Sequence, residues 1–111
     1  MQVILLPEIL EYLEELAEIL YEKGYFSFGD TSMEYILDLH DDIVSNLPTK
    51  HHKPAPKYFD KYGKNMKYAS FKKSKHTIWY VFFKTYKEND KTFYLVRYIS
   101  NNHVIAQYLH P

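Results

Sequence analysis

The chain has 111 residues, 18% of them aromatic, and contains no cysteine. This length suits one domain with a single hydrophobic core, and the lack of cysteine excludes disulfide bonds and thiolate metal sites. The formal net charge is zero. Residues 1–49 nevertheless carry eleven acids and one base, whereas residues 50–111 carry thirteen bases and three acids. This asymmetry indicates either contact with nucleic acid or two solvated faces that balance each other.

An apolar run of strand length, QVILL, opens the chain at residues 2–6 and ends before Pro7. The run has no positive charge before it and is too short to cross a membrane. We therefore expect no signal peptide, no membrane segment and a cytoplasmic location.

Two acidic amphipathic helices are predicted next. Apolar residues recur at helical spacing from Pro7, which suits a first turn, to a stop at Gly24. The second helix is expected to begin near Thr31, where Thr31-Ser32-Met33-Glu34 matches a capping box, and to end at Pro48. Short connections between helices favour antiparallel neighbours, so the pair is predicted to form a helical hairpin.

Residues 49–65 show no sustained periodicity and are predicted to form a loop, with a helical turn at residues 57–62. Pro54 and Pro56 break any longer helix. His51 and His52 are adjacent and no third ligand is spaced for zinc, so no metal site is predicted.

The clearest strands are predicted at residues 66–73 and 77–86, which are rich in aromatic and β-branched residues and are joined by a lysine-rich turn. A turn at Asn89-Asp90 leads to a third strand at residues 92–100. The tail is expected to be a short helix or strand. The fold class is therefore α+β: an N-terminal strand, a helical hairpin covering one face of the sheet, a three-stranded antiparallel meander and a short C-terminal segment.

The order of these elements, with WYVFF at residues 79–83 and LVRYISNNHVIAQYL at residues 95–109, resembles the toxins of the RelE/ParE superfamily. The resemblance implies the toxin of a bacterial type II toxin–antitoxin system, of the kind that serves plasmid stabilization. RelE-like members are ribosome-dependent endoribonucleases that cut mRNA in the ribosomal A site. ParE-like members inhibit DNA gyrase and are not nucleases. A cognate antitoxin neutralises both kinds.

The resemblance also suggests site residues. Lys73 and Lys75 match basic positions of the family, and Tyr108 falls near its C-terminal catalytic tyrosine. His103 and His110 are candidates because other ribonucleases of the superfamily place histidine near the C-terminal end. Tyr80, and Asn102 or His103, stand where RelE-like enzymes carry arginine. A ParE-like inhibitor would be expected to lack those arginines.

Cleavage of RNA by its own 2′-hydroxyl needs a base, an acid and positive charge near the phosphate. Histidine supplies the acid or base near neutral pH, and Trp79 is expected to belong to the core rather than to the site. We predict a RelE-like, metal-independent endoribonuclease without a cofactor, with mRNA on the ribosome and an antitoxin as partners. The alternatives are a ParE-like gyrase inhibitor and a non-toxic binding module. The predicted catalytic residues are His103, Tyr108 and His110, and the predicted RNA-binding residues are Lys67, Lys72, Lys73, Lys75, Tyr80 and Arg97.

Overall fold

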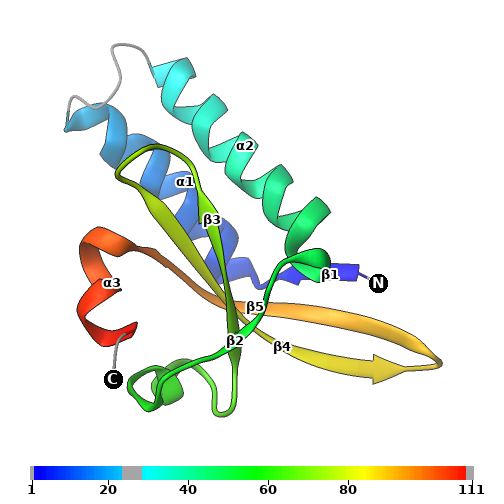
Figure 1. Ribbon diagram of the computed structural model, residues 1–111. Helices are drawn as coiled ribbons and strands as arrows, with labels where there is room; N and C mark the ends of the chain where they lie inside the picture. The colour runs from blue at the N-terminus through cyan, green and yellow to red at the C-terminus, as the bar shows by residue number, and fades with distance from the viewer. Residues whose placement is uncertain (1, 24–28, 110–111) are drawn as a thin grey trace.

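The computed structural model describes residues 2–23 and 29–109 and has an α+β fold (Figure 1). In chain order its elements are β1 (Gln2–Leu5), α1 (Pro7–Glu22), α2 (Gly29–Asn46), the 3₁₀ helix η1 (Leu47–Thr49), β2 (Lys53–Pro54), the 3₁₀ helix η2 (Lys57–Tyr62), β3 (Lys67–Lys72), β4 (Ile78–Glu88), β5 (Lys91–Asn101) and α3 (Asn102–Leu109). This order confirms the predicted fold class, and it makes the C-terminal segment a helix.

The strands form one sheet in the order β1-β5-β4-β3-β2. The meander β3-β4-β5 is antiparallel, as predicted, and β1 runs parallel to β5 at one edge. At the other edge β2 pairs with β3 through only two residues. These two residues were predicted to belong to a loop, because a pair that includes Pro54 has no strand pattern.

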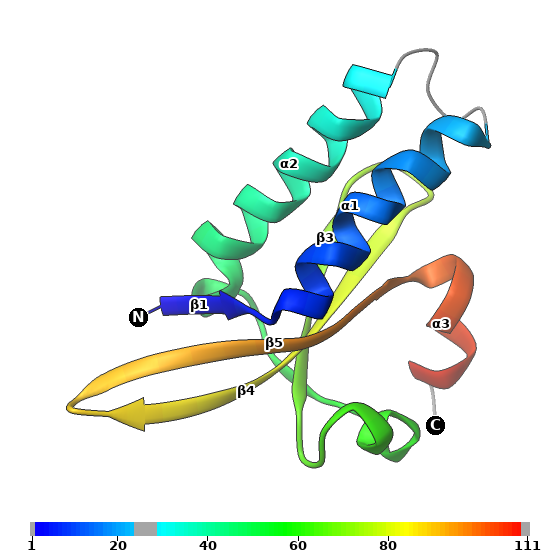
Figure 2. The same ribbon diagram turned by 180° about the vertical axis from the view of Figure 1, so that it is seen from behind.

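The helices α1 and α2 lie side by side over one face of the sheet (Figure 2). Their apolar stripes meet the strand residues that point to the same side, so that Phe71, Trp79 and Val81 are buried with Leu39 and Ile43 of α2. Alternation along a strand sends every second side chain to this face. The helical hairpin predicted from periodicity is therefore confirmed as the cover of the main core.

The two long helices differ in how well the sequence predicted the residue at which each begins. Pro7 occupies the first turn of α1, as predicted. By contrast, α2 begins at Gly29, so Thr31 already lies within the helix and the prediction that it caps the N-terminus is wrong. The expected stop at Gly24 and the connection after it lie outside the described residues.

A second cluster of buried side chains covers part of the opposite face of the sheet. It joins Phe59 of η2 and Ile105 and Leu109 of α3 to Met66 and Phe82. Figure 1 shows η2 and α3 on the side away from the two long helices. Because β4 is covered on both faces here, its run IWYVFF is almost continuously apolar rather than alternating.

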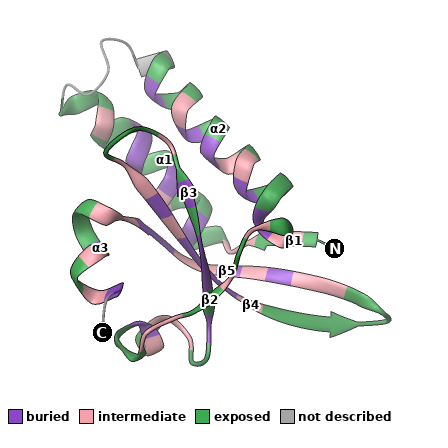
Figure 3. Ribbon diagram, in the orientation of Figure 1, coloured by how far each residue is buried: buried purple, intermediate pink, exposed green. Residues whose placement is uncertain are grey.

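The distal halves of β4 and β5 extend past the end of β3 (Figures 1 and 3). Beyond the residues of β5 that pair with β1, they form a two-stranded arm. Residues Lys87 and Glu88 and the turn at Asn89 and Asp90 are exposed. Both turn residues have positive φ, 52° and 65°, as the predicted two-residue hairpin turn requires. The arm therefore carries little of the core. Among the described helices, none is long and apolar enough to cross a membrane.

Candidate functional site

A cavity of about 740 Å³ opens where three segments meet: the end of α1, the turn between β3 and β4, and the junction of β5 with α3. Figure 1 shows this turn beside α1, above the start of α3. We call this cavity the histidine cleft, because both His76 and His103 line it. Its other polar lining residues are Lys23, Tyr35, Ser74, Thr77 and Asn101.

The histidine cleft is held together by Asn102, the first residue of α3. Its side-chain Oδ1 accepts a hydrogen bond of 2.9 Å from the backbone N–H of Ile78, and its Nδ2 donates one of 3.0 Å to the carbonyl of His76. One side chain therefore satisfies both a donor and an acceptor of the β3–β4 turn. This places His76 and the start of α3 next to each other although they are far apart in the sequence.

His103 is exposed and its imidazole faces the same turn. Its Nε2 lies 3.3 Å from Thr77 Oγ1, with which it is hydrogen bonded, and its backbone N–H donates to Asn101 Oδ1 at 2.9 Å. The bond to Thr77 holds the ring at the turn, and the residue remains open to solvent. Imidazole is the side chain that most often serves as a general acid or base.

The floor of the histidine cleft is apolar. Trp79 is only 1% exposed and lies within the main core, as predicted, and its indole N–H donates a hydrogen bond of 2.8 Å to the hydroxyl of Tyr35. Because Trp79 is so completely buried, neither face of its indole ring is free for a nucleobase to stack on. The polar groups of the cleft therefore surround an apolar floor, which is the usual composition of a ligand site.

Tyr108 lies in a different cluster, at the other end of α3. Its ring stacks on that of Tyr58 with 3.8 Å between centroids, and the Lys61 Nζ lies 4.0 Å from the centre of the Tyr58 ring. The hydrogen bond from Lys61 lowers the pKa of Tyr58, while the hydrogen bond with Tyr58 raises the pKa of Tyr108. The structure therefore separates Tyr108 from His103. His110 lies outside the described residues.

Arg97 and Tyr80 face the second cluster rather than the histidine cleft. The register of β5 shifts beside Phe82 and Phe83, which leaves Arg97 as an extra residue in the ladder. Its Nε donates a hydrogen bond of 2.9 Å to the carbonyl of Tyr62. Tyr80 is half-buried, and its ring meets Tyr68 edge-on at 5.9 Å.

Gly63 makes room for this arginine. Its φ is 154°, and a Cβ added there would lie 2.9 Å from Arg97 Nε. The residue after η2 therefore has to be glycine for the Arg97–Tyr62 contact to form. The neighbouring Tyr98 stacks on Tyr62 at 3.9 Å, and burial raises the pKa of Tyr98 to about 12.

The four predicted RNA-binding lysines do not share one surface. Lys67 and Lys72 are the first and last residues of β3, and Lys73 is half-buried with its Nζ 3.4 Å from Asp42 Oδ2. Lys75 is exposed in the turn, between two residues that line the histidine cleft. Lys75 therefore lies next to the cleft in the chain, although it is not one of the residues that line it.

The roles of His76, Lys23 and the Asn102 clamp were not predicted from the sequence. The signal for His76 is present, since it stands in a turn between two predicted strands, but nothing local connects it with His103.

Within the described ranges, no three histidine, aspartate or glutamate side chains are grouped as a metal site requires. Comparisons of the chain with models of protein families, with curated proteins and with solved structures found no match.

Proposed function

We propose that this protein is a metal-independent endoribonuclease that acts as the toxin of a bacterial type II toxin–antitoxin system of the RelE/ParE kind. The main support is the histidine cleft, where His76, His103 and Lys23 line one cavity. Two histidines and a lysine can supply the base, the acid and the positive charge that cleavage by a ribose 2′-hydroxyl needs.

In this mechanism one imidazole removes the proton from a ribose 2′-hydroxyl. The 2′-oxygen then attacks the adjacent phosphorus, and the bond from phosphorus to the 5′-oxygen of the next nucleotide breaks. The second imidazole, protonated, gives its proton to that leaving oxygen. The products are a 2′,3′-cyclic phosphate and a free 5′-hydroxyl, and Lys23 offsets the charge that develops on the phosphate. One neutral and one protonated histidine give a bell-shaped dependence of rate on pH.

The partners follow from the family resemblance. The proposed substrate is mRNA in the ribosome, and the proposed inhibitor is a cognate antitoxin. The order of strands and helices supports this proposal, because it is the order that the resemblance implies.

The test is cleavage of a reporter mRNA in a reconstituted translation reaction, with cleavage sites mapped by primer extension. Each of His76→Ala and His103→Ala should lower the rate by about 10²–10⁴-fold, the usual contribution of a well-placed acid or base. His51→Ala is the matched control, since it removes an exposed histidine outside the cleft. Cleavage that survives both cleft substitutions but is lost in Tyr108→Phe would move the active site to the Tyr58–Tyr108 cluster and contradict the assignment.

A ParE-like inhibitor of DNA gyrase is the second candidate. What favours it is the position of Arg97, the only arginine of the chain, whose Nε is engaged by the Tyr62 carbonyl away from the histidine cleft. Double-strand DNA breaks after induction, with intact mRNA, would support this function and exclude the nuclease.

A further inference from the structure

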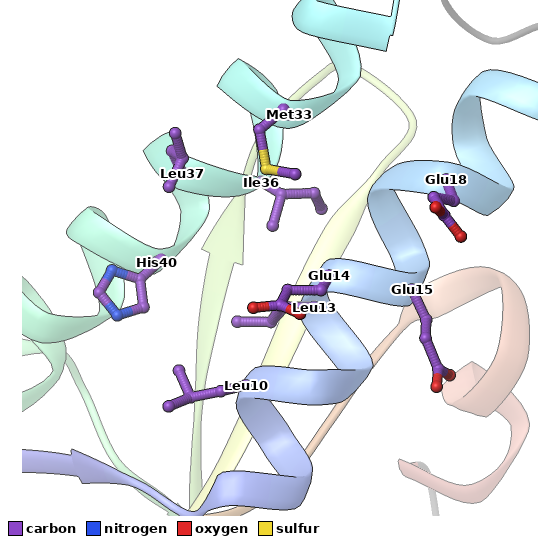
Figure 4. Close-up of a pocket in the computed structure, with 9 residues that line it drawn as sticks. All are labelled: Leu10, Leu13, Glu14, Glu15, Glu18, Met33, Ile36, Leu37 and His40. Atoms are coloured by element: carbon purple, nitrogen blue, oxygen red, sulfur yellow. The ribbon is translucent and has the colours of Figure 1, made fainter.

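A second concavity lies between the two long helices. This groove, which we call the interhelical groove, has a volume of about 530 Å³, and its apolar lining comes from both helices (Figure 4). Leu13 and Ile36 form part of it and are buried, whereas Leu10, Met33 and Leu37 are 41%, 40% and 51% exposed. Met33 and Leu37 are four residues apart and so lie on one face of α2. Three exposed, large apolar side chains from the two helices therefore gather in one groove.

The border of the interhelical groove is acidic. Glu14, Glu15 and Glu18 of α1 line it. Among the described residues the two ion pairs are His40–Asp41 and Lys73–Asp42, so no glutamate of α1 has a cationic partner. Glutamates four residues apart, as at positions 14 and 18, destabilise a helix by repulsion. A cationic partner laid along the groove would remove this repulsion.

We propose that the interhelical groove binds an amphipathic helix of another protein, whose apolar stripe is flanked by lysine or arginine. A groove between two side-by-side helices accepts a third helix, which places its side chains at positions i, i+3, i+4 and i+7 between them. The cations of the incoming helix would meet the glutamates of α1. This inference does not depend on the proposed nuclease activity, because the groove and the histidine cleft share no lining residue.

A second copy of the chain is a poor occupant. Two copies joined through this surface would bring glutamates against glutamates. The remaining helix of the described part, α3, buries Ile105 and Leu109 in its own core and carries no lysine or arginine there. We therefore take a helix of another protein as the occupant.

The probes for a binding test are two synthetic helical peptides with the same leucine stripe, one flanked by lysine and the other by glutamate. Binding to the full chain is followed by fluorescence anisotropy of the labelled peptide. The lysine peptide should bind and the glutamate peptide should not. Leu37→Asp should weaken binding of the lysine peptide at least tenfold. Val44→Asp, at another exposed apolar position of α2 that lies outside the groove, should leave it unchanged.

A second pair of variants tests the charge. Glu14→Gln combined with Glu18→Gln should weaken binding and reduce its dependence on salt. The matched control is Glu8→Gln with Glu22→Gln, which removes two carboxylates of the same helix outside the groove. Equal binding by both peptides, or equal losses in Leu37→Asp and Val44→Asp, would overturn the proposal. A dimer in sedimentation that Leu37→Asp dissociates would also overturn it, by making a second copy the occupant.

Discussion

At the scale of single residues, Asp42 makes the contact with the clearest pH dependence. Burial by itself would raise the pKa of its carboxyl, but the hydrogen bond of 2.6 Å from Asn46 and the contact with Lys73 outweigh it, so the pKa is lowered. Because the folded-state pKa lies below the unfolded one, the carboxylate stabilises the fold at neutral pH. That stabilisation is lost as the pH falls through the folded-state pKa.

Asp42→Asn should therefore lower the free energy of unfolding at pH 7 by about 0.5 kcal/mol, as is typical of a partly exposed ion pair. The difference from the parent chain should shrink as the pH drops below about 4, near the ordinary pKa of aspartate. Urea unfolding at a series of pH values measures both effects. Asp38→Asn, which removes an exposed carboxylate of the same helix, is the control. A difference that stays constant down to pH 2 would show that the charge of Asp42 is not its cause.

The residues of the histidine cleft differ in how far their roles could be predicted from the sequence. His103 was a candidate through the family resemblance alone. Trp79 was correctly assigned to the core, because an aromatic run at strand spacing is visible locally. His76 was not identified as a partner of His103. Their proximity depends on the pairing of β4 with β5 and on Asn102, whose bonds span 24 and 26 residues. No local pattern carries that information.

At the scale of elements, Asn102 connects α3 to the β3–β4 turn. Asn102→Ala removes both of its hydrogen bonds, each contributing about 0.5–1.5 kcal/mol. The variant should unfold with a free energy about 2 kcal/mol lower, and Asn102→Asp, which keeps the acceptor for Ile78 but not the donor, should lose about half as much. Urea denaturation measures this, with Gln107→Ala, at an exposed position of α3, as the control. Equal stability of Asn102→Ala and Gln107→Ala would contradict the role of the clamp.

Elements differed in how far they could be predicted. The meander was predictable because β3, β4 and β5 carry long aromatic and β-branched runs with clear turns between them. The strand β2 was not, because two residues that include Pro54 carry no pattern and gain their structure only from pairing with β3. The start of α2 was predicted two residues too late, because a capping box at Thr31 is only a local preference and the helix already begins at Gly29.

At the scale of the whole molecule, the charges are divided between the layers. Both long helices are acidic, and Lys23, the one base among residues 1–49, lies at the histidine cleft. The lysines of residues 50–75 are spread over both ends of β3, the turn and the loop before it. Of the basic residues, Lys23 lines the cleft and Lys75 lies in the turn between two residues that line it. RNA is therefore expected to approach the cleft from the side of the turn.

This expectation predicts the salt dependence of RNA binding. The logarithm of the association constant of a single strand falls with the logarithm of salt concentration, with a slope of about −0.7 for each phosphate neutralised. Lys23→Ala with Lys75→Ala should reduce the size of that slope by about 1.4. Lys84→Ala with Lys87→Ala, in the half of β4 that leads into the β4–β5 arm, should leave the slope unchanged. Figure 1 shows the arm far from the β3–β4 turn. Anisotropy of labelled RNA between about 50 and 200 mM salt measures the slope. A slope that falls only with the arm variant would show that RNA binds along the arm, and the histidine cleft would then be too far away to cleave it.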